Sequence, residues 1–176
     1  EQAAIPVRFY ATAGMRDVNP VIQNQTYSDI ISWVSSNFNF IDIDAKTIPG
    51  EQEALYNWLA VNYLNDAFVT ESQPAAIFDL GGGSAEVAYL TEDETGPSVF
   101  ELALGGQTYR VAADTWLGVG QDWARQQYLD HEGCFPVDYP MPDVRYYAGD
   151  LAACQQTVYD PFAINAQLHS MSLSCS

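Results

Sequence analysis

The chain has 176 residues, of which 48% are hydrophobic, so it can bury a core as one domain or as two small lobes. It carries 23 acidic and 6 basic residues, and its formal charge is −17. Such a surface repels nucleic acid, which excludes DNA or RNA as a partner. It also repels a phosphorylated substrate, unless that substrate brings a divalent cation or meets a locally positive site. No run of about 18 apolar residues occurs, so we expect no membrane span in this chain.

The first part of the chain predicts a strand, a helix and a second strand. The apolar run Ile5–Tyr10 is typical of a short strand. Apolar residues then recur with the spacing of one helix face, which predicts an amphipathic helix from about Pro20 to Ser35. These residues are Tyr27, Ile30, Ile31 and Val34. Alternating apolar and polar residues predict the next strand over Phe38–Ile43.

A second helix follows, from about Gly50 to Asp66, with an apolar stripe that includes Trp58. Its first turn contains Glu51 and Glu53, which suit the positive end of the helix dipole and need no catalytic role to explain them. The polar segment after this helix, Glu71–Pro74, is the best candidate for a linker.

The stretch from Ala76 to Tyr89 reads as a strand, a glycine turn and a second strand. Asp79 lies among apolar residues, where a carboxylate is costly unless a metal ion or a metal-bound water compensates it. The glycines Gly81, Gly82 and Gly83 let the backbone approach a phosphate closely. Ser84 and Glu86 are two residues apart on the second strand, so both side chains lie on the same face. The alternative is an ordinary hairpin with a glycine-rich turn, but the flanking Asp and Ser-x-Glu favour phosphate or metal binding. No Walker or dinucleotide-binding pattern is present.

The rest of the chain is less informative. Val99–Leu104 alternates like a strand, and Gly105 and Gly106 mark a turn. Helical spacing predicts a helix over about 112–123, weakened by two glycines. A short helix is also expected over 150–159. Together these elements predict an α/β protein with two lobes that share a cleft.

Three cysteines occur, at spacings too wide for a paired zinc motif. Cys134 and Cys154 could close a disulfide loop in an oxidising compartment, which leaves Cys175 for a partner outside the chain. Buried free thiols are the alternative.

Three segments resemble the apyrases, the nucleoside tri- and diphosphate hydrolases. Ala11–Arg16 looks like their second signature, Gly50–Leu64 resembles the third, and Asp79–Glu86 resembles the fourth, in the family's order. The similarity covers most of residues 4–136. It implies an actin/hexokinase-like (ribonuclease H-like) fold of two lobes, with the active site between them. On this basis we expect 1–72 to form the back half of the first lobe and 73–176 to form the second.

The resemblance also implies hydrolysis of terminal nucleotide phosphates with Mg²⁺ or Ca²⁺ as cofactor. Glu53 matches the glutamate that activates the attacking water, while Asp79, Ser84 and Glu86 match residues that hold the metal's water shell or the nucleophilic water. Asp79 is therefore the expected metal residue, acting through water, and Glu53, Ser84 and Glu86 are the expected catalytic residues. The expected phosphate-binding residues are Thr12, Ala13, Gly14, Gly81, Gly82, Gly83 and Ser84.

The chain departs from the family pattern at several positions. It has Glu86 where the family usually has Gln, Gly83 where it has a small residue such as Ala, and Ala54 where it has Gly. An acidic residue at 86 resembles the exopolyphosphatase branch of the superfamily, so polyphosphate remains an alternative substrate.

No segment matches the family's first phosphate-binding loop, so we expect a partial chain whose site is completed by a further segment or partner chain. A non-catalytic module that binds nucleotide or assembles with a partner is therefore a third alternative. The family and the acidity favour an exported protein, in a periplasmic, secreted or lumenal location.

Overall fold

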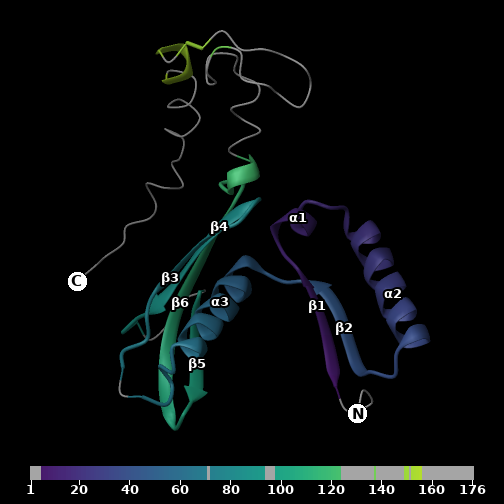
Figure 1. Cartoon of the computed structure of the whole chain (residues 1–176), viewed down its shortest axis with the longest axis horizontal. Coiled ribbons are helices and arrows are strands. Elements are labelled where there is room, and N and C mark those ends of the chain that lie inside the picture. Colours follow the sequence, from purple (N-terminus) through teal and green to yellow (C-terminus); the bar gives the residue numbers. More distant parts are fainter. Residues whose placement is uncertain are drawn as a thin grey trace. The chain divides into compact units, whose positions relative to one another are not determined.

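The computed structural model describes residues 5–70, 72–93, 98–123, 137, 149–150 and 152–155. The chain separates into two compact units, Glu1–Asp122 and Trp123–Ser176. The elements of the first unit are β1 (Pro6–Ala11), α1 (Ala13–Arg16), α2 (Pro20–Asn37), β2 (Ile41–Thr47), α3 (Gly50–Leu64), β3 (Ile77–Leu80), β4 (Ser84–Leu90), β5 (Val99–Leu104) and β6 (Gln107–Leu117) (Figure 1). The predicted α/β class is thus confirmed. Within the described ranges, no helix has the length and hydropathy that crossing a membrane requires.

The first two strands, β1 and β2, form a parallel pair in which Ala11 lies opposite Thr47. The predicted second strand, Phe38–Ile43, begins too early, because β2 runs over Ile41–Thr47. Phe38 and Phe40 stack on each other at a centroid distance of 5.5 Å instead of entering the sheet. In β2 the buried Ala45 alternates with charged neighbours, and these charges hide the strand pattern in the sequence.

The long helix α2 packs on β2. Its bounds, Pro20–Asn37, are close to the predicted range of about Pro20 to Ser35. Its start is fixed by Asn19, whose side chain accepts a hydrogen bond of 2.9 Å from the backbone N–H of Val21, with Pro20 at the first helical position. Tyr27 and Val34 are the buried residues of its apolar stripe.

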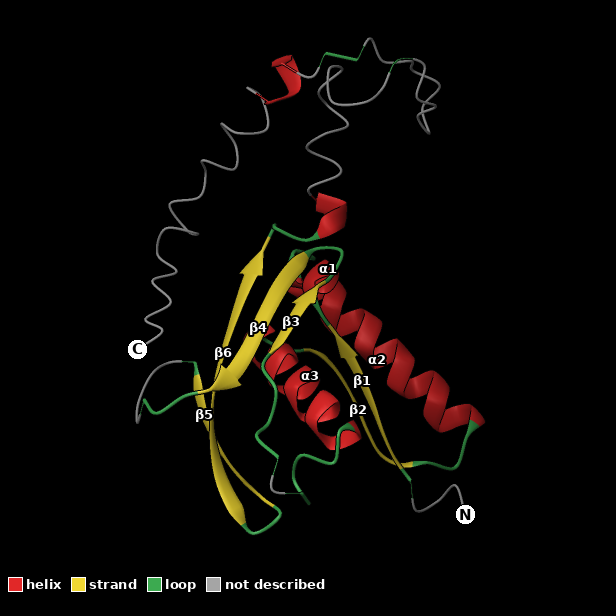
Figure 2. Cartoon of the chain, turned by 60° about the vertical axis from the view of Figure 1, so that its left-hand side comes forward, coloured by secondary structure: helices red, strands yellow, loops and turns green. Residues whose placement is uncertain are grey.

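The four-stranded sheet has the order β3–β4–β6–β5, and all neighbouring strands are antiparallel. Helix α3 runs along this sheet, which Figures 1 and 2 show from two directions, and packs against β6, β4 and β3. The predicted turn at Gly105 and Gly106 joins β5 to β6. Both glycines have positive φ, 59° and 82°, as a tight hairpin between twisted strands requires.

The helix predicted over about 112–123 is wrong, because the first half of that range belongs to β6. Ala112 and Trp116 lie on the face of β6 that points away from the core, so apolar residues occur on both faces and the sequence shows no clean alternation. Val111 and Ala113 are fully buried beneath α3, and Ala112 is 8% exposed on the other face. The strand ends at Leu117, and Gly118, which follows it, has a φ of 86°.

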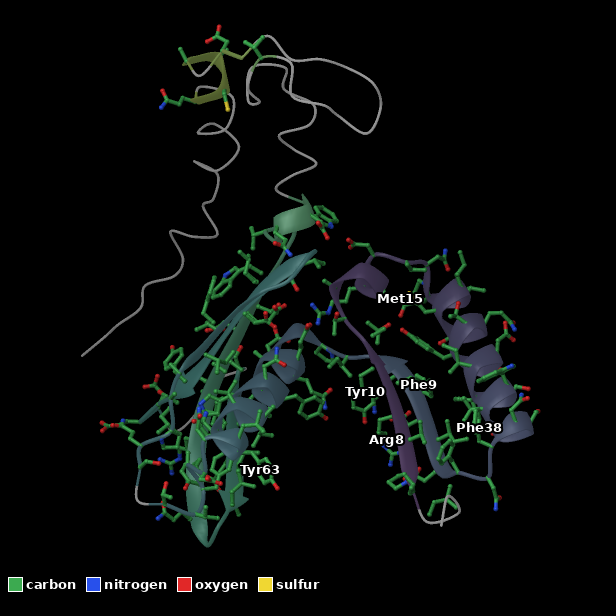
Figure 3. All side chains as sticks on the ribbon, viewed as in Figure 1. Arg8, Phe9, Tyr10, Met15, Phe38 and Tyr63 are labelled. Carbon is green, nitrogen blue, oxygen red and sulfur yellow. The ribbon has the colours of Figure 1, made fainter. Side chains whose placement is uncertain are left out.

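The core lies between α3 and the four-stranded sheet. Its buried members are Ala54, Leu55, Trp58, Ile77, Ala88, Tyr109, Val111 and Ala113. The Trp58 ring lies 5.6 Å from the ring of Phe68 and 6.2 Å from that of Tyr109. Tyr63, by contrast, is 74% exposed on α3 (Figure 3). One face of α3 is therefore fixed against the sheet, and the residues beside that face have defined positions.

The segment that follows α3 is fixed by Asn62, a buried polar residue of the helix. Its side chain donates to the carbonyl of Ala75 at 3.0 Å and accepts from the N–H of Ala75 at 2.7 Å. Both ends of the amide are thus paired, which a buried Asn requires. The division of the chain at residues 72 and 73 stays a prediction.

Two further expectations concern the second unit. Residues 152–155 are helical, and the remainder of the predicted helix over 150–159 falls largely outside the described residues. Cys154 is disulfide-bonded. The other two cysteines lie outside the described residues, so the suggested pairing with Cys134 stays a prediction.

The close approach of α3 to β6 leaves no room for a side chain at Gly50. A Cβ at this position would lie 2.2 Å from Thr115 Oγ1. We therefore expect Gly50→Ala to lower the free energy of unfolding by about 1–3 kcal/mol. Gly14→Ala is the control, because among the described residues no heavy atom beyond its chain neighbours and its own helix lies within 4 Å of the added Cβ. Urea unfolding of both variants tests this, and equal stability of Gly50→Ala and the unsubstituted chain would contradict the packing described here.

Candidate active site

Three carboxylates from different elements meet at one end of the α3–sheet interface. They belong to Glu53 of α3, Asp79 of β3 and Glu86 of β4, and one oxygen of each lies within 4.8 Å of the others. We call these residues the carboxylate cluster. Asp79 and Glu86 are paired across the β3–β4 hairpin, which places both side chains on the same face of the sheet. Helix α3 covers that face and brings Glu53 to them.

Glu86 is the most deeply buried member of the cluster, with 1% of its surface exposed. Its Oε1 accepts hydrogen bonds from the hydroxyl of Ser84 and, at 3.1 Å, from that of Thr115. Thr115 lies opposite Glu86 in the β4–β6 pair, so strand register fixes this contact. The other oxygen, Oε2, has no hydrogen-bond partner among the described residues. A buried carboxylate oxygen without a donor is costly, so this atom is a candidate to bind a water or a cation.

Asp79 is held by a residue of α3. The side-chain amide of Asn57 donates a hydrogen bond of 2.7 Å to Asp79 Oδ2. Asn57 follows Glu53 by four residues, so both lie on one face of the helix. The same turn of α3 therefore positions one carboxylate directly and orients a second by hydrogen bonding.

Arg16, the last residue of α1, is the positive charge beside the cluster. Its Nε donates to the carbonyl of Ile48 at 3.1 Å, and its Nη2 lies 2.5 Å from Glu53 Oε2. Its Nη1 lies 3.8 Å from Glu86 Oε1, too far for a hydrogen bond, and has no other partner among the described residues. One cation thus faces two carboxylates and compensates only part of their charge.

The environment of Glu53 raises the pKa of its carboxyl group above the ordinary value of 4.5. Burial is the main cause, since it disfavours the charged form. The hydrogen bond from Arg16 acts in the opposite direction, and the nearby charges of Glu86 and Asp79 raise the pKa further. A glutamate with a raised pKa is better suited to accept a proton from water than an ordinary surface glutamate.

The glycine loop, Gly81–Gly83, joins β3 to β4 beside the cluster. Its carbonyls accept hydrogen bonds of 2.8–2.9 Å from the backbone N–H groups of Gly118, Gln121 and Asp122. A Cβ at Gly120 would lie 2.3 Å from the carbonyl oxygen of Gly82, so this close approach requires glycine. With its carbonyls held on one side, the loop leaves the N–H groups of Gly82 and Gly83 without an acceptor among the described residues.

The turn Thr12–Gly14 lies at the start of α1. Thr12 is the N-cap residue, but its side chain makes no capping hydrogen bond. Within the described part of the chain, no hydrogen bond or ion pair joins this turn to the glycine loop. Its connection to the cluster runs through Arg16, at the other end of α1.

The structure therefore brings together Glu53, Asp79, Ser84 and Glu86, four of the residues predicted from sequence. Sequence reasoning missed Arg16, Asn57 and Thr115. Arg16 lies within the Ala11–Arg16 motif, and the spacing of four residues between Glu53 and Asn57 is the signal that could have identified Asn57. Thr115 was hidden because its segment was interpreted as a helix.

Comparison with known proteins bears out the resemblance. The model of the GDA1/CD39 (nucleoside phosphatase) family matches residues 1–133. The chain therefore belongs to this family. "Probable apyrase 4" of Arabidopsis thaliana is 35% identical over 126 residues, which cover 69% of this chain and 25% of the relative. "Golgi apyrase" of Saccharomyces cerevisiae is 30% identical over 147 residues, covering 72% of this chain and 23% of the relative. The chain thus spans about a quarter of the length of these relatives.

Among solved structures, a nucleoside triphosphate hydrolase from Neospora caninum has a similar fold, with a TM-score of 0.51 and 17% sequence identity. The match covers 78% of this chain and 29% of that chain. The predicted actin/hexokinase-like architecture, incomplete in this chain, is therefore confirmed at the level of the fold.

The pKa of Glu53 gives a test that does not depend on activity. Replacing Arg16 with Met removes the hydrogen bond and the charge that favour the ionised carboxylate, so we expect the pKa of Glu53 to rise further. ¹³C NMR titration of the glutamate side chains measures this, with Glu53→Gln to assign the resonance. Arg8→Met is the matched control, because Arg8 pairs with Asp42 on the other sheet.

The same shift affects stability. Because native Glu53 holds its proton more tightly than the unfolded chain does, its contribution to stability increases as pH falls through the raised pKa towards 4.5. An unchanged or lower pKa of Glu53 in Arg16→Met would contradict the assigned contacts.

Proposed function

We propose that this chain supplies the water-activating half of a phosphohydrolase site that removes terminal phosphates from nucleoside tri- and diphosphates. The observation that carries the proposal is the carboxylate cluster beside a glycine loop whose Gly82 and Gly83 N–H groups have no acceptor in the part of the chain that the structure describes. Membership of the nucleoside phosphatase family and the names of the apyrase relatives support the substrate class.

In this proposal, Glu53 is the general base. It accepts a proton from a water molecule whose oxygen attacks the terminal phosphorus, while the bond from that phosphorus to the bridging oxygen breaks. Ser84 and Glu86 hold the attacking water. Burial of Glu53 and the raised pKa of its carboxyl group support this role.

The phosphate is bound by backbone groups. The free N–H groups of Gly82 and Gly83 are suited to the oxygens of a transferred phosphoryl group, with Ser84 adjacent. Thr12, Ala13 and Gly14 form the second proposed contact, through the hydroxyl of Thr12 and the first N–H groups of α1. Further phosphate contacts in the whole protein would come from a segment outside this chain.

The donor set fits a hard divalent cation. All three residues of the carboxylate cluster offer oxygen atoms, and Glu86 has a buried oxygen to which no described residue donates a hydrogen bond. Asp79 would hold Mg²⁺ or Ca²⁺ through water, with its carboxylate oriented by Asn57. A bound cation would neutralise phosphate charge, which an acidic protein needs in order to accept a nucleotide.

We also propose a lumenal or exported location. Cys154 is disulfide-bonded, and disulfides persist mainly in oxidising compartments. The Golgi apyrases of two yeasts are among the relatives, which is consistent with this location.

The test is the release of phosphate from ATP and ADP by this chain, measured in the presence of Mg²⁺, Ca²⁺ or a chelator. We expect release that requires the cation and falls by about 10²- to 10⁴-fold in Glu53→Gln, because the general base is lost. Glu51→Gln is the matched control: Glu51 lies in the same first turn of α3 but outside the carboxylate cluster.

Two alternatives are separated by the same assay. Faster release from long polyphosphate than from ATP would favour an exopolyphosphatase-like enzyme, an alternative that the acidic residue Glu86 supports. Saturable nucleotide binding without turnover under any condition would favour a non-catalytic module. Turnover that is unaffected by Glu53→Gln would contradict the proposed base.

A further inference from the structure

The guanidinium group of Arg16 lies where a cation would compensate the carboxylate cluster. It contacts Glu53 Oε2 at 2.5 Å, faces Glu86 Oε1 at 3.8 Å, and has 14% of its side-chain surface exposed. We propose that Arg16 is an internal counter-ion, which compensates part of the charge of Glu53 and Glu86 in the metal-free protein and withdraws from Glu53 when a divalent cation binds. This inference rests on the proposed function, because it takes the cluster to be a cation site.

The contacts of Arg16 are incomplete for a permanent structural ion pair. Arginine and carboxylate usually form two parallel hydrogen bonds, and buried polar atoms are usually satisfied. Here Nη1 of Arg16 and Oε2 of Glu86 are both buried without a hydrogen-bond partner in the described part of the chain. The pairing therefore leaves donors and acceptors unused, which favours exchange of the guanidinium for a better-matched cation.

Arg16 also has a contact that does not depend on the cluster. Its Nε donates to the carbonyl of Ile48, the last residue but one before α3. This hydrogen bond can hold the side chain near the site while the two Nη groups change position. Nη2 of Arg16 is hydrogen-bonded to Oε2 of Glu53, so in the metal-free state only Oε1 of that carboxylate is available as a proton acceptor. With the cation held by Asp79 and Glu86, withdrawal of Arg16 would return Oε2 of Glu53 to water, which couples cation binding to exposure of the proposed base.

Binding of Mn²⁺ to the chain, measured from the electron paramagnetic resonance signal of free Mn²⁺, tests the proposal. If Arg16 competes with the cation, Arg16→Met should bind Mn²⁺ about tenfold more tightly than the unsubstituted chain, a difference of about 1.4 kcal/mol. Arg8→Met removes the same charge from the exposed Arg8–Asp42 pair and should leave the affinity nearly unchanged. Asp79→Asn should weaken Mn²⁺ binding both in the unsubstituted chain and in the Arg16→Met variant. This result would assign the Mn²⁺ to the carboxylate cluster.

A second measurement uses the protein with Arg16 intact, in case Arg16→Met does not fold. On addition of Mg²⁺, the ¹⁵N side-chain resonances of Arg16 should shift while those of Arg8 stay in place. Equal or weaker Mn²⁺ binding by a folded Arg16→Met variant, or unchanged Arg16 resonances at saturating Mg²⁺, would overturn the proposal. If the Arg16 proposal is overturned but Asp79→Asn still loses Mn²⁺ binding, the cation site of the proposed function stands. Absence of Mn²⁺ binding in every variant would overturn both.

Discussion

The site depends on three carboxylates that lie close together and are partly or fully buried. Two like charges about 4 Å apart repel each other by roughly 4 kcal/mol at an effective dielectric constant of 20. Glu53, Asp79 and Glu86 lie at about this spacing, and each is compensated differently. Arg16 pairs with Glu53, Asn57 donates to Asp79, and two hydroxyls donate to Glu86. The compensation is incomplete, and the residual negative charge gives the site its capacity to attract a cation.

The fold supplies this arrangement through register and close packing. Asp79, Glu86 and Thr115 lie opposite one another on three neighbouring strands, β3, β4 and β6. Gly50 allows the first turn of α3 to approach Thr115, and the core around Trp58 fixes the rest of the helix on the same sheet. The residues that hold the site and the residues that hold the fold are thus largely the same, so many substitutions near the cluster will alter both stability and the proposed activity.

The sequence predicted which candidate residues lie together better than it predicted the bounds of the surrounding elements. Period-two alternation was sufficient to place Ser84 and Glu86 on one face, because a strand of the hairpin fixes that geometry locally. The position of Glu53 beside them came only from the family resemblance, since contact between a helix and a sheet is a tertiary property. The contacts of Arg16 and Thr115 could not be predicted from the sequence either, because they also join residues of different elements. The second half of β6 was interpreted as a helix because Ala112 and Trp116 put apolar residues on the face away from the core, and the alternation of the strand is lost.

The central claim is that the carboxylate cluster is a cation-assisted phosphohydrolase site. The most direct test is a crystal structure of the chain with Mn²⁺ and a non-hydrolysable nucleotide analogue, using anomalous diffraction at the manganese edge. The account predicts an anomalous peak within the carboxylate cluster, beside Asp79 and Glu86, with the terminal phosphate against the glycine loop. A peak elsewhere, or a phosphate bound away from Gly81–Gly83, would contradict it.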